Sequence, residues 1–211
     1  MRVLAISDEE NERVYSLIGK APFEKIALIV SCGDLPYSYL EYLVTLSQAP
    51  LVYVPGNHDP RYHSQDPLTY AEGCLNLDGQ VERVQGLLLA GLGGSIRYRP
   101  GVNQYTQEEM FVRVWKLVPR LLLNRIVFHR WLDILVTHAP PFGIHDEAGT
   151  AHEGFRAFNW LLRLTRASYH LHGHFHANWS NLRSSMTRYG ATQVVNVFPY
   201  RMLELHVPFA P

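Results

Sequence analysis

The chain has 211 residues, close to the roughly 100–200 expected of one domain, and a chain of this length can bury about 70% of its unfolded surface. Hydrophobic residues make up 47% and charged residues 18%, which excludes a disordered, collagen-like or coiled-coil chain. Nineteen basic and nineteen acidic residues cancel, which excludes the broad positive field of a non-specific nucleic-acid or membrane-surface binder. We therefore predict a single domain over residues 1–211, with long nucleic acid disfavoured and no membrane partner.

Cysteine content and the length of the apolar segments indicate the cellular compartment. The two cysteines, Cys32 and Cys74, are too few for a disulfide scaffold, and no secretion signal precedes the strand-like run at residues 2–6. No apolar stretch approaches the roughly 18 uncharged residues of a bilayer span, because residues 117–128 are broken by one proline and two arginines. The sequence therefore predicts a soluble, cytoplasmic protein.

The first third of the chain alternates between two hydrophobic periods. Three short apolar runs, at residues 3–6, 26–30 and 51–54, each end in a polar turn and predict buried strands. Residues 12–19 and 37–47 between them have apolar residues at helical spacing. The order β-α-β-α-β implies parallel strands joined by right-handed crossovers.

The middle of the chain predicts a hairpin and a helix. Residues 81–84 and 87–92 are separated by a Gln-Gly turn, as in an antiparallel hairpin. Thr106 followed by Glu109 predicts a capping box, and the helix is expected to run to about Val118, where the following proline interrupts or ends it.

The last third predicts further strands and one amphipathic helix, with a sheet on each side of the core. The helix covers residues 154–166, with Phe155 and Phe158 on its apolar stripe as core residues. The expected strands are residues 134–136, 169–171, 192–197 and 202–206.

Five polar clusters stand at the ends of apolar runs, at residues 7–10, 33–34, 56–59, 137–138 and 173–176. Strand carboxyl ends gather at one edge of an α/β sheet, so these clusters can converge. Carboxylate oxygens, an asparagine carbonyl oxygen and neutral imidazoles suit a pair of divalent ions such as Mn²⁺, Fe²⁺ or Zn²⁺. No cysteine belongs to the set, which argues against a thiolate zinc finger.

In this order the motifs resemble those of the calcineurin-like metallophosphoesterases, and more specifically the small prokaryotic phosphoesterases related to cyclic-nucleotide phosphodiesterases. The motifs are Asp8-Glu9-Glu10, Gly33-Asp34, Gly56-Asn57-His58-Asp59, His138 and Gly173-His174-Phe175-His176. The resemblance covers residues 8–176. It implies an α/β fold, a metallophosphoesterase-like four-layer α/β/β/α sandwich with two mixed sheets.

The resemblance also implies roles. Asp34 would bridge two divalent metal ions, with Mn²⁺ favoured, lying about 3.5–4 Å apart. The remaining ligands would be Asp8, Glu10 and His176 for the first ion, and Asn57, His138 and His174 for the second. His58 would be the catalytic residue that stabilises or protonates the leaving oxygen. A hydroxide held between the ions would attack a small phosphate ester, with a phosphodiester favoured; the sequence does not separate diesters from monoesters.

One position departs from the family pattern, which has histidine where this chain has Glu10. A glutamate reaches about as far as an imidazole and could ligate the first ion, whereas a Glu10 that points away would leave that site short of a ligand. The alternative function is therefore a catalytically weakened scaffold that acts as a protein-interaction module. No oligomeric state is predicted.

Several other polar residues have a structural interpretation from the sequence. His129, His170 and His206 are expected to be structural or solvated, and His172 to pack or bond behind the site. His145 and His152 lie in a loop that could cover the site, although a solvated position is favoured. Arg97 is a candidate phosphate clamp.

Overall fold

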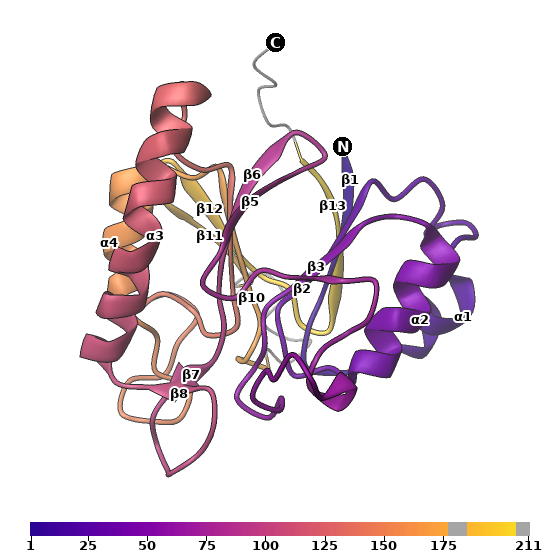
Figure 1. Ribbon diagram of the computed structural model, residues 1–211, viewed down its shortest axis with the longest axis horizontal. Helices are drawn as coiled ribbons and strands as arrows, with labels where there is room; N and C mark the ends of the chain where they lie inside the picture. The colour runs from indigo at the N-terminus through magenta and orange to yellow at the C-terminus, as the bar shows by residue number, and fades with distance from the viewer. Residues whose placement is uncertain (177–184, 206–211) are drawn as a thin grey trace.

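The computed structural model describes residues 1–176 and 185–205, and these form four layers (Figure 1). The helices are α1 (Glu12–Leu17), α2 (Tyr37–Ser47), α3 (Gln107–Val127) and α4 (Arg156–Thr165), with a 3₁₀ turn η1 (Pro67–Thr69). Two sheets lie face to face, one covered by α1 and α2 and the other by α3 and α4. The expected α/β/β/α sandwich is confirmed.

Both large sheets are mixed. The first contains β1 (Arg2–Ile6), β2 (Leu28–Ser31), β3 (Leu51–Tyr53), β4 (Leu75–Asn76) and β13 (Tyr200–Glu204). Its order is β13-β1-β2-β3-β4, parallel except for β13. The expected parallel β-α-β-α-β unit is therefore present.

The second sheet is parallel at its centre and antiparallel at both edges. Its strands are β5 (Val81–Val84), β6 (Leu87–Leu92), β9 (Ile134–Thr137), β10 (Tyr169–His172), β11 (Met186–Tyr189) and β12 (Thr192–Asn196). Their order is β11-β12-β10-β9-β6-β5, and the expected hairpin is β5–β6. A small separate pair is formed by β7 (Ser95–Ile96) and β8 (Gln104–Tyr105).

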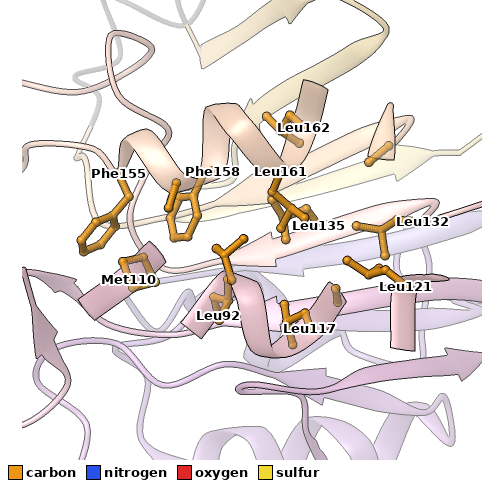
Figure 2. Packing of buried hydrophobic residues seen from close by; sticks show 14 of the residues in the cluster. Leu92, Met110, Leu117, Leu121, Leu132, Leu135, Phe155, Phe158, Leu161 and Leu162 are labelled. Carbon is orange, nitrogen blue, oxygen red and sulfur yellow. The ribbon is translucent and has the colours of Figure 1, made fainter. Parts of the chain in front are cut away.

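Alternation along the strands divides the core into three parts. On β1, Val3 and Ala5 belong to the cluster between the two sheets, whereas Leu4 and Ile6 pack under α1 and α2. The third cluster lies under α3 and α4 (Figure 2). Because the central strands are buried on both faces, their sequences are continuous apolar runs.

The helix that was expected to be interrupted or ended by Pro119 continues to Val127, so that prediction was wrong. The capping box of Thr106 and Glu109 is present as expected. Pro119 lies on the exposed face, where the carbonyl that loses its helical partner can bond water. Beyond it Leu121 is buried, so packing against the sheet extends the helix past the proline.

Four strands were not expected: β4, β7, β8 and β11. All are short, and β11 is an edge strand that exposes Met186, which weakens the sequence signal. The strand expected at 202–206 begins earlier, at Tyr200, because that residue pairs with Ile6 of β1; His206 lies outside the described residues. Across the described ranges, no helix has both the length and the apolar content to cross a bilayer.

Candidate metal centre

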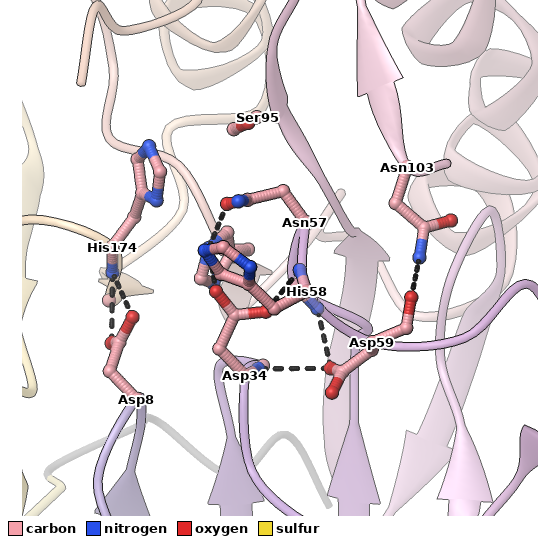
Figure 3. Close-up of polar contacts among 12 residues, drawn as sticks. Asp8, Asp34, Asn57, His58, Asp59, Ser95, Asn103 and His174 are labelled. Atoms are coloured by element: carbon pink, nitrogen blue, oxygen red, sulfur yellow. Dashed lines mark hydrogen bonds and ion pairs between the residues drawn. The ribbon is translucent and has the colours of Figure 1, made fainter. Parts of the chain in front are cut away.

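Five polar residues follow five parallel strands and lie together at one edge of the sandwich, four of them labelled in Figure 3. They are Asp8 after β1, Asp34 after β2, Asn57 after β3, His138 after β9 and His174 after β10. The first three come from one sheet and the last two from the other. The sandwich therefore brings together most of the residues that the sequence assigned to a metal site.

Asp34, His138 and His174 form the core of this cluster. Each offers a ligand atom, and these atoms all lie within 4.8 Å of one another. Among the Asp, Glu, His and Cys side chains of the described residues, these three have the spacing of a metal site. Asn57 joins it, because its Oδ1 atom lies 3.0 Å from Nε2 of His138.

The orientation of His138 is set by the first sheet. Its Nδ1 atom lies 2.8 Å from the carbonyl oxygen of Cys32, which can only accept, so Nδ1 carries a proton. Nε2 then faces the cluster, 3.3 Å from Oδ2 of Asp34. Burial lowers the pKa of His138, but the Asp34 carboxylate raises it more, to about 9. At this pKa Nε2 also carries a proton, and a bound cation would take the place of that proton.

His174 is oriented in the same manner by a backbone oxygen. Its Nε2 atom lies 2.7 Å from the carbonyl oxygen of Ala151 and donates to it, which leaves Nδ1 as the ligand atom. Burial and the nearby charge of His138 lower the pKa of His174 to about 3. His174 is thus a neutral imidazole, the form that binds metals.

Backbone and side-chain donors hold Asp34 as a carboxylate. Burial raises its pKa, but His138 and the backbone N–H of His58, 2.8 Å from Oδ1, lower it to about 2. Gly56 lies so close that an added Cβ would stand 2.0 Å from Oδ1 of Asp34. The site therefore requires glycine at this position.

Asp59 is a supporting residue to which the sequence analysis gave no role. Its Oδ2 atom accepts hydrogen bonds from the backbone N–H groups of Asp34, at 2.9 Å, and Gly56, at 2.7 Å. Asn103 donates to its carbonyl oxygen (Figure 3). Burial raises the pKa of Asp59 to about 6. Its place in the Gly-Asn-His-Asp motif was the signal that could have identified it.

Asp8 and His176 make a second pair of candidate ligands. Nε2 of His176 lies 3.6 Å from Oδ1 of Asp8, and the His176 ring stacks on Phe198 at 4.4 Å. The hydrogen bond to Asp8 raises the pKa of His176, and the charge of Glu9 adds to the effect. The Asp8 side chain is buried, whereas the His176 side chain is 61% exposed.

Glu10 is exposed and lines a surface hollow with Tyr15 and Ser16, beside α1. It is not part of the described metal-site group. Its assignment as a ligand stays a prediction.

His58 and Tyr98 contact residues of the cluster. The His58 side chain is exposed, and its backbone N–H bonds to Asp34. The Tyr98 hydroxyl lies 3.5 Å from Nδ2 of Asn57. Arg97, the candidate phosphate clamp, instead forms an ion pair with Glu109 at 2.7 Å. The structure therefore turns Arg97 toward the capping box of α3.

Two further histidines are partnered within the protein. His145, for which a solvated position was favoured, is half-buried and bonded to His172 and Thr187. Burial lowers the pKa of His145 to about 4. His170 is fully buried, with Nε2 2.7 Å from Oγ1 of Thr137, as expected of a structural residue.

The donors fit a divalent ion with nitrogen and oxygen preferences. The cluster offers the carboxylate of Asp34, the amide oxygen of Asn57 and one ring nitrogen each from His138 and His174. The other ring nitrogen of each histidine bonds to a backbone carbonyl oxygen. Burial raises the pKa of the nearby Cys32 thiol far above its usual range, so no thiolate is offered. This chemistry suits Mn²⁺, Fe²⁺ or Zn²⁺.

The fold and this donor set define a class: an α/β/β/α sandwich with a candidate metal centre at the strand ends. A model of the calcineurin-like phosphoesterases matches residues 1–178. The match covers most of the chain, which therefore belongs to the calcineurin-like phosphoesterase family.

Two curated proteins and one solved structure are similar to this chain. The chain is 28% identical over 155 residues to an uncharacterized protein of Methanocaldococcus jannaschii, covering 67% of this chain and 62% of that protein. It is 29% identical over 174 residues to an uncharacterized protein of Haemophilus influenzae, covering 74% and 75%. The crystal structure of TT1561 from Thermus thermophilus has the same fold, with a TM-score of 0.65, 19% identity and coverage of 93% and 88%.

Proposed function

We propose that this protein is a metal-dependent phosphoesterase that hydrolyses a small phosphate ester, with a phosphodiester favoured. The observation that carries the proposal is the convergence of Asp34, His138 and His174, with ligand atoms within 4.8 Å of one another, beside the exposed His58. Family membership supports phosphoester hydrolysis in general. The zero net charge disfavours a long nucleic acid as substrate.

Two divalent ions are proposed, of unequal affinity. Asp34, Asn57, His138 and His174 would hold one, while Asp8 and His176 would hold the other with Asp34 shared. Because Glu10 is exposed, we expect the ion at Asp8 and His176 to have fewer protein ligands and to bind more weakly. When bound, the ions would lower the pKa of a water molecule and offset charge on the phosphoryl oxygens. We favour Mn²⁺ because the donors are oxygen and nitrogen without thiolate.

His58 is proposed as the group that protonates or stabilises the leaving oxygen. It is exposed, and its backbone is held beside the cluster by the hydrogen bond to Asp34. An imidazole can hold and donate a proton and is therefore suited to general acid catalysis. His58→Gln should lower kcat while metal affinity stays unchanged.

The test is hydrolysis of an aryl phosphodiester, and of the matching monoester, by metal-stripped protein to which Mn²⁺ is returned. Turnover that needs Mn²⁺ and disappears in Asp34→Asn would support the proposal, and the ratio of the two rates would define the preferred ester. No turnover of either ester by folded, metal-loaded protein would contradict it. That result would favour the scaffold alternative, which the exposed Glu10 also favours.

A further inference from the structure

A continuous chain of hydrogen bonds runs from the edge of the second sheet to the metal centre. Oγ1 of Thr187, on β11, lies 2.8 Å from Nε2 of His145. Nδ1 of His145 lies 2.9 Å from Nε2 of His172, and Nδ1 of His172 lies 3.1 Å from the carbonyl oxygen of Gly173. This series of hydrogen bonds therefore ends at Gly173, the residue that precedes His174.

The direction of these hydrogen bonds follows from the acceptor at the end. The Gly173 carbonyl can only accept, so Nδ1 of His172 donates. His172 is fully buried, which favours the neutral imidazole, and its Nε2 must then accept from Nδ1 of His145. Nε2 of His145 in turn accepts from the Thr187 hydroxyl. Both rings thus carry their proton on Nδ1.

The peptide group between Gly173 and His174 lies among the candidate ligands. Its N–H donates to Oδ2 and Oδ1 of Asp8 at 3.0 and 3.2 Å (Figure 3). The N–H of Gly173 donates to the carbonyl oxygen of His138 at 3.0 Å. A Cβ on Gly173 would stand 2.4 Å from Oδ2 of Asp8, so this backbone has no room for a larger residue.

We propose that His145 and His172 are positioning residues for the metal centre. By bonding to the Gly173 carbonyl they fix the plane of the peptide whose N–H holds Asp8 and whose next side chain is the ligand His174. A hydrogen bond to a peptide carbonyl also polarises that peptide and strengthens the bond that its N–H makes. The inference rests on the proposed function only in taking Asp8 and His174 as metal ligands.

The test is the affinity of metal-stripped protein for Mn²⁺, measured by calorimetric titration. In His145→Asn the side-chain amide can replace Nδ1 as donor to His172, whereas His145→Leu removes the donor. We expect His145→Leu to weaken Mn²⁺ binding by about 10–100-fold, as loss of an outer contact to a ligand does, and His145→Asn to stay near wild type. Equal affinity of His145→Leu and wild type would overturn the inference.

A matched control separates positioning from loss of stability. His170, like His172, is a fully buried histidine on β10, but its Nε2 bonds to Thr137 and not to the Gly173 carbonyl. His170→Leu should lower the thermal unfolding temperature without changing Mn²⁺ affinity. If it weakens Mn²⁺ binding as much as His145→Leu, the effect is general destabilisation and the inference is wrong.

The proton positions supply a readout independent of metal and activity. Long-range ¹H–¹⁵N correlation spectra of the imidazoles should show the Nδ1–H form for both His145 and His172. An Nε2–H form of either ring would overturn the inference.

Weakened Mn²⁺ binding in His145→Leu, in a protein that cleaves no ester, would support the inference and contradict the proposed function. Ester cleavage with unchanged Mn²⁺ affinity in His145→Leu would do the reverse, and wild-type protein that binds no Mn²⁺ would contradict both.

Discussion

The Nδ1 atom of His138 lies 2.8 Å from the carbonyl oxygen of Cys32, and this hydrogen bond joins the two sheets at the candidate metal centre. His138 follows β9 of the second sheet, and Cys32 follows β2 of the first. The imidazole is therefore oriented by a backbone group 106 residues away in the chain. The metal centre depends on the two sheets being packed together.

Removing the imidazole of His138 should abolish tight metal binding. His138→Ala is expected to lower Mn²⁺ affinity by more than the roughly 10–100-fold that loss of an outer contact costs, because a direct ligand is lost. Metal-stripped protein titrated with Mn²⁺ measures this, and the circular dichroism spectrum checks that the variant is folded. A folded variant with wild-type affinity would show that His138 is not a ligand.

Glu10 should be dispensable for metal binding. Its side chain is exposed, whereas the Asp8 side chain is buried beside His176, so Glu10→Ala should leave the number and affinity of bound Mn²⁺ ions unchanged. Asp8→Asn serves as the comparison and should lose the more weakly held ion. Elemental analysis after equilibrium dialysis counts the ions. A loss in Glu10→Ala equal to that in Asp8→Asn would mean that Glu10 ligates in the loaded protein.

Pro119 should limit the stability of α3. Proline in a helix interior costs up to about 3 kcal/mol, and Pro119 is exposed, so alanine meets no steric obstacle there. Pro119→Ala is therefore expected to raise the free energy of unfolding, by about 1 kcal/mol or more. Urea denaturation measures the change. A decrease would show that the native backbone at this position is adapted to proline.

The metal-free protein should lose stability as pH falls below about 6.5. Burial lowers the pKa of His170 from 6.5 to about 3, so below pH 6.5 the unfolded chain binds a proton that the folded protein does not. The contribution of His170 is complete above pH 6.5 and falls by about 1.4 kcal/mol per pH unit toward pH 3.

Urea denaturation between pH 7 and pH 5 tests this expectation. His170→Phe removes the titrating group, and the pH dependence of its unfolding free energy should be smaller than that of wild type by about one proton. The same slope in both proteins would mean that His170 is protonated in the folded state.

Local patterns in the sequence determined the strand–helix order and the five clusters at the strand ends. Short apolar runs predicted β1, β2 and β3, and Thr106 with Glu109 predicted the start of α3. These signals are short-range, because alternation, helical spacing and capping act between near neighbours. Their order also carried the family resemblance, which the match over residues 1–178 confirmed.

Only the tertiary structure decided which of these groups meet. The N–H of His174 bonds to Asp8 across 166 residues, and His145 bonds to His172 where the sequence favoured a solvated position. No local pattern records such contacts, since they depend on how the two sheets pack. The same packing explains why α3 continues beyond Pro119, because burial of Leu121 outweighs the cost of a proline in the helix interior.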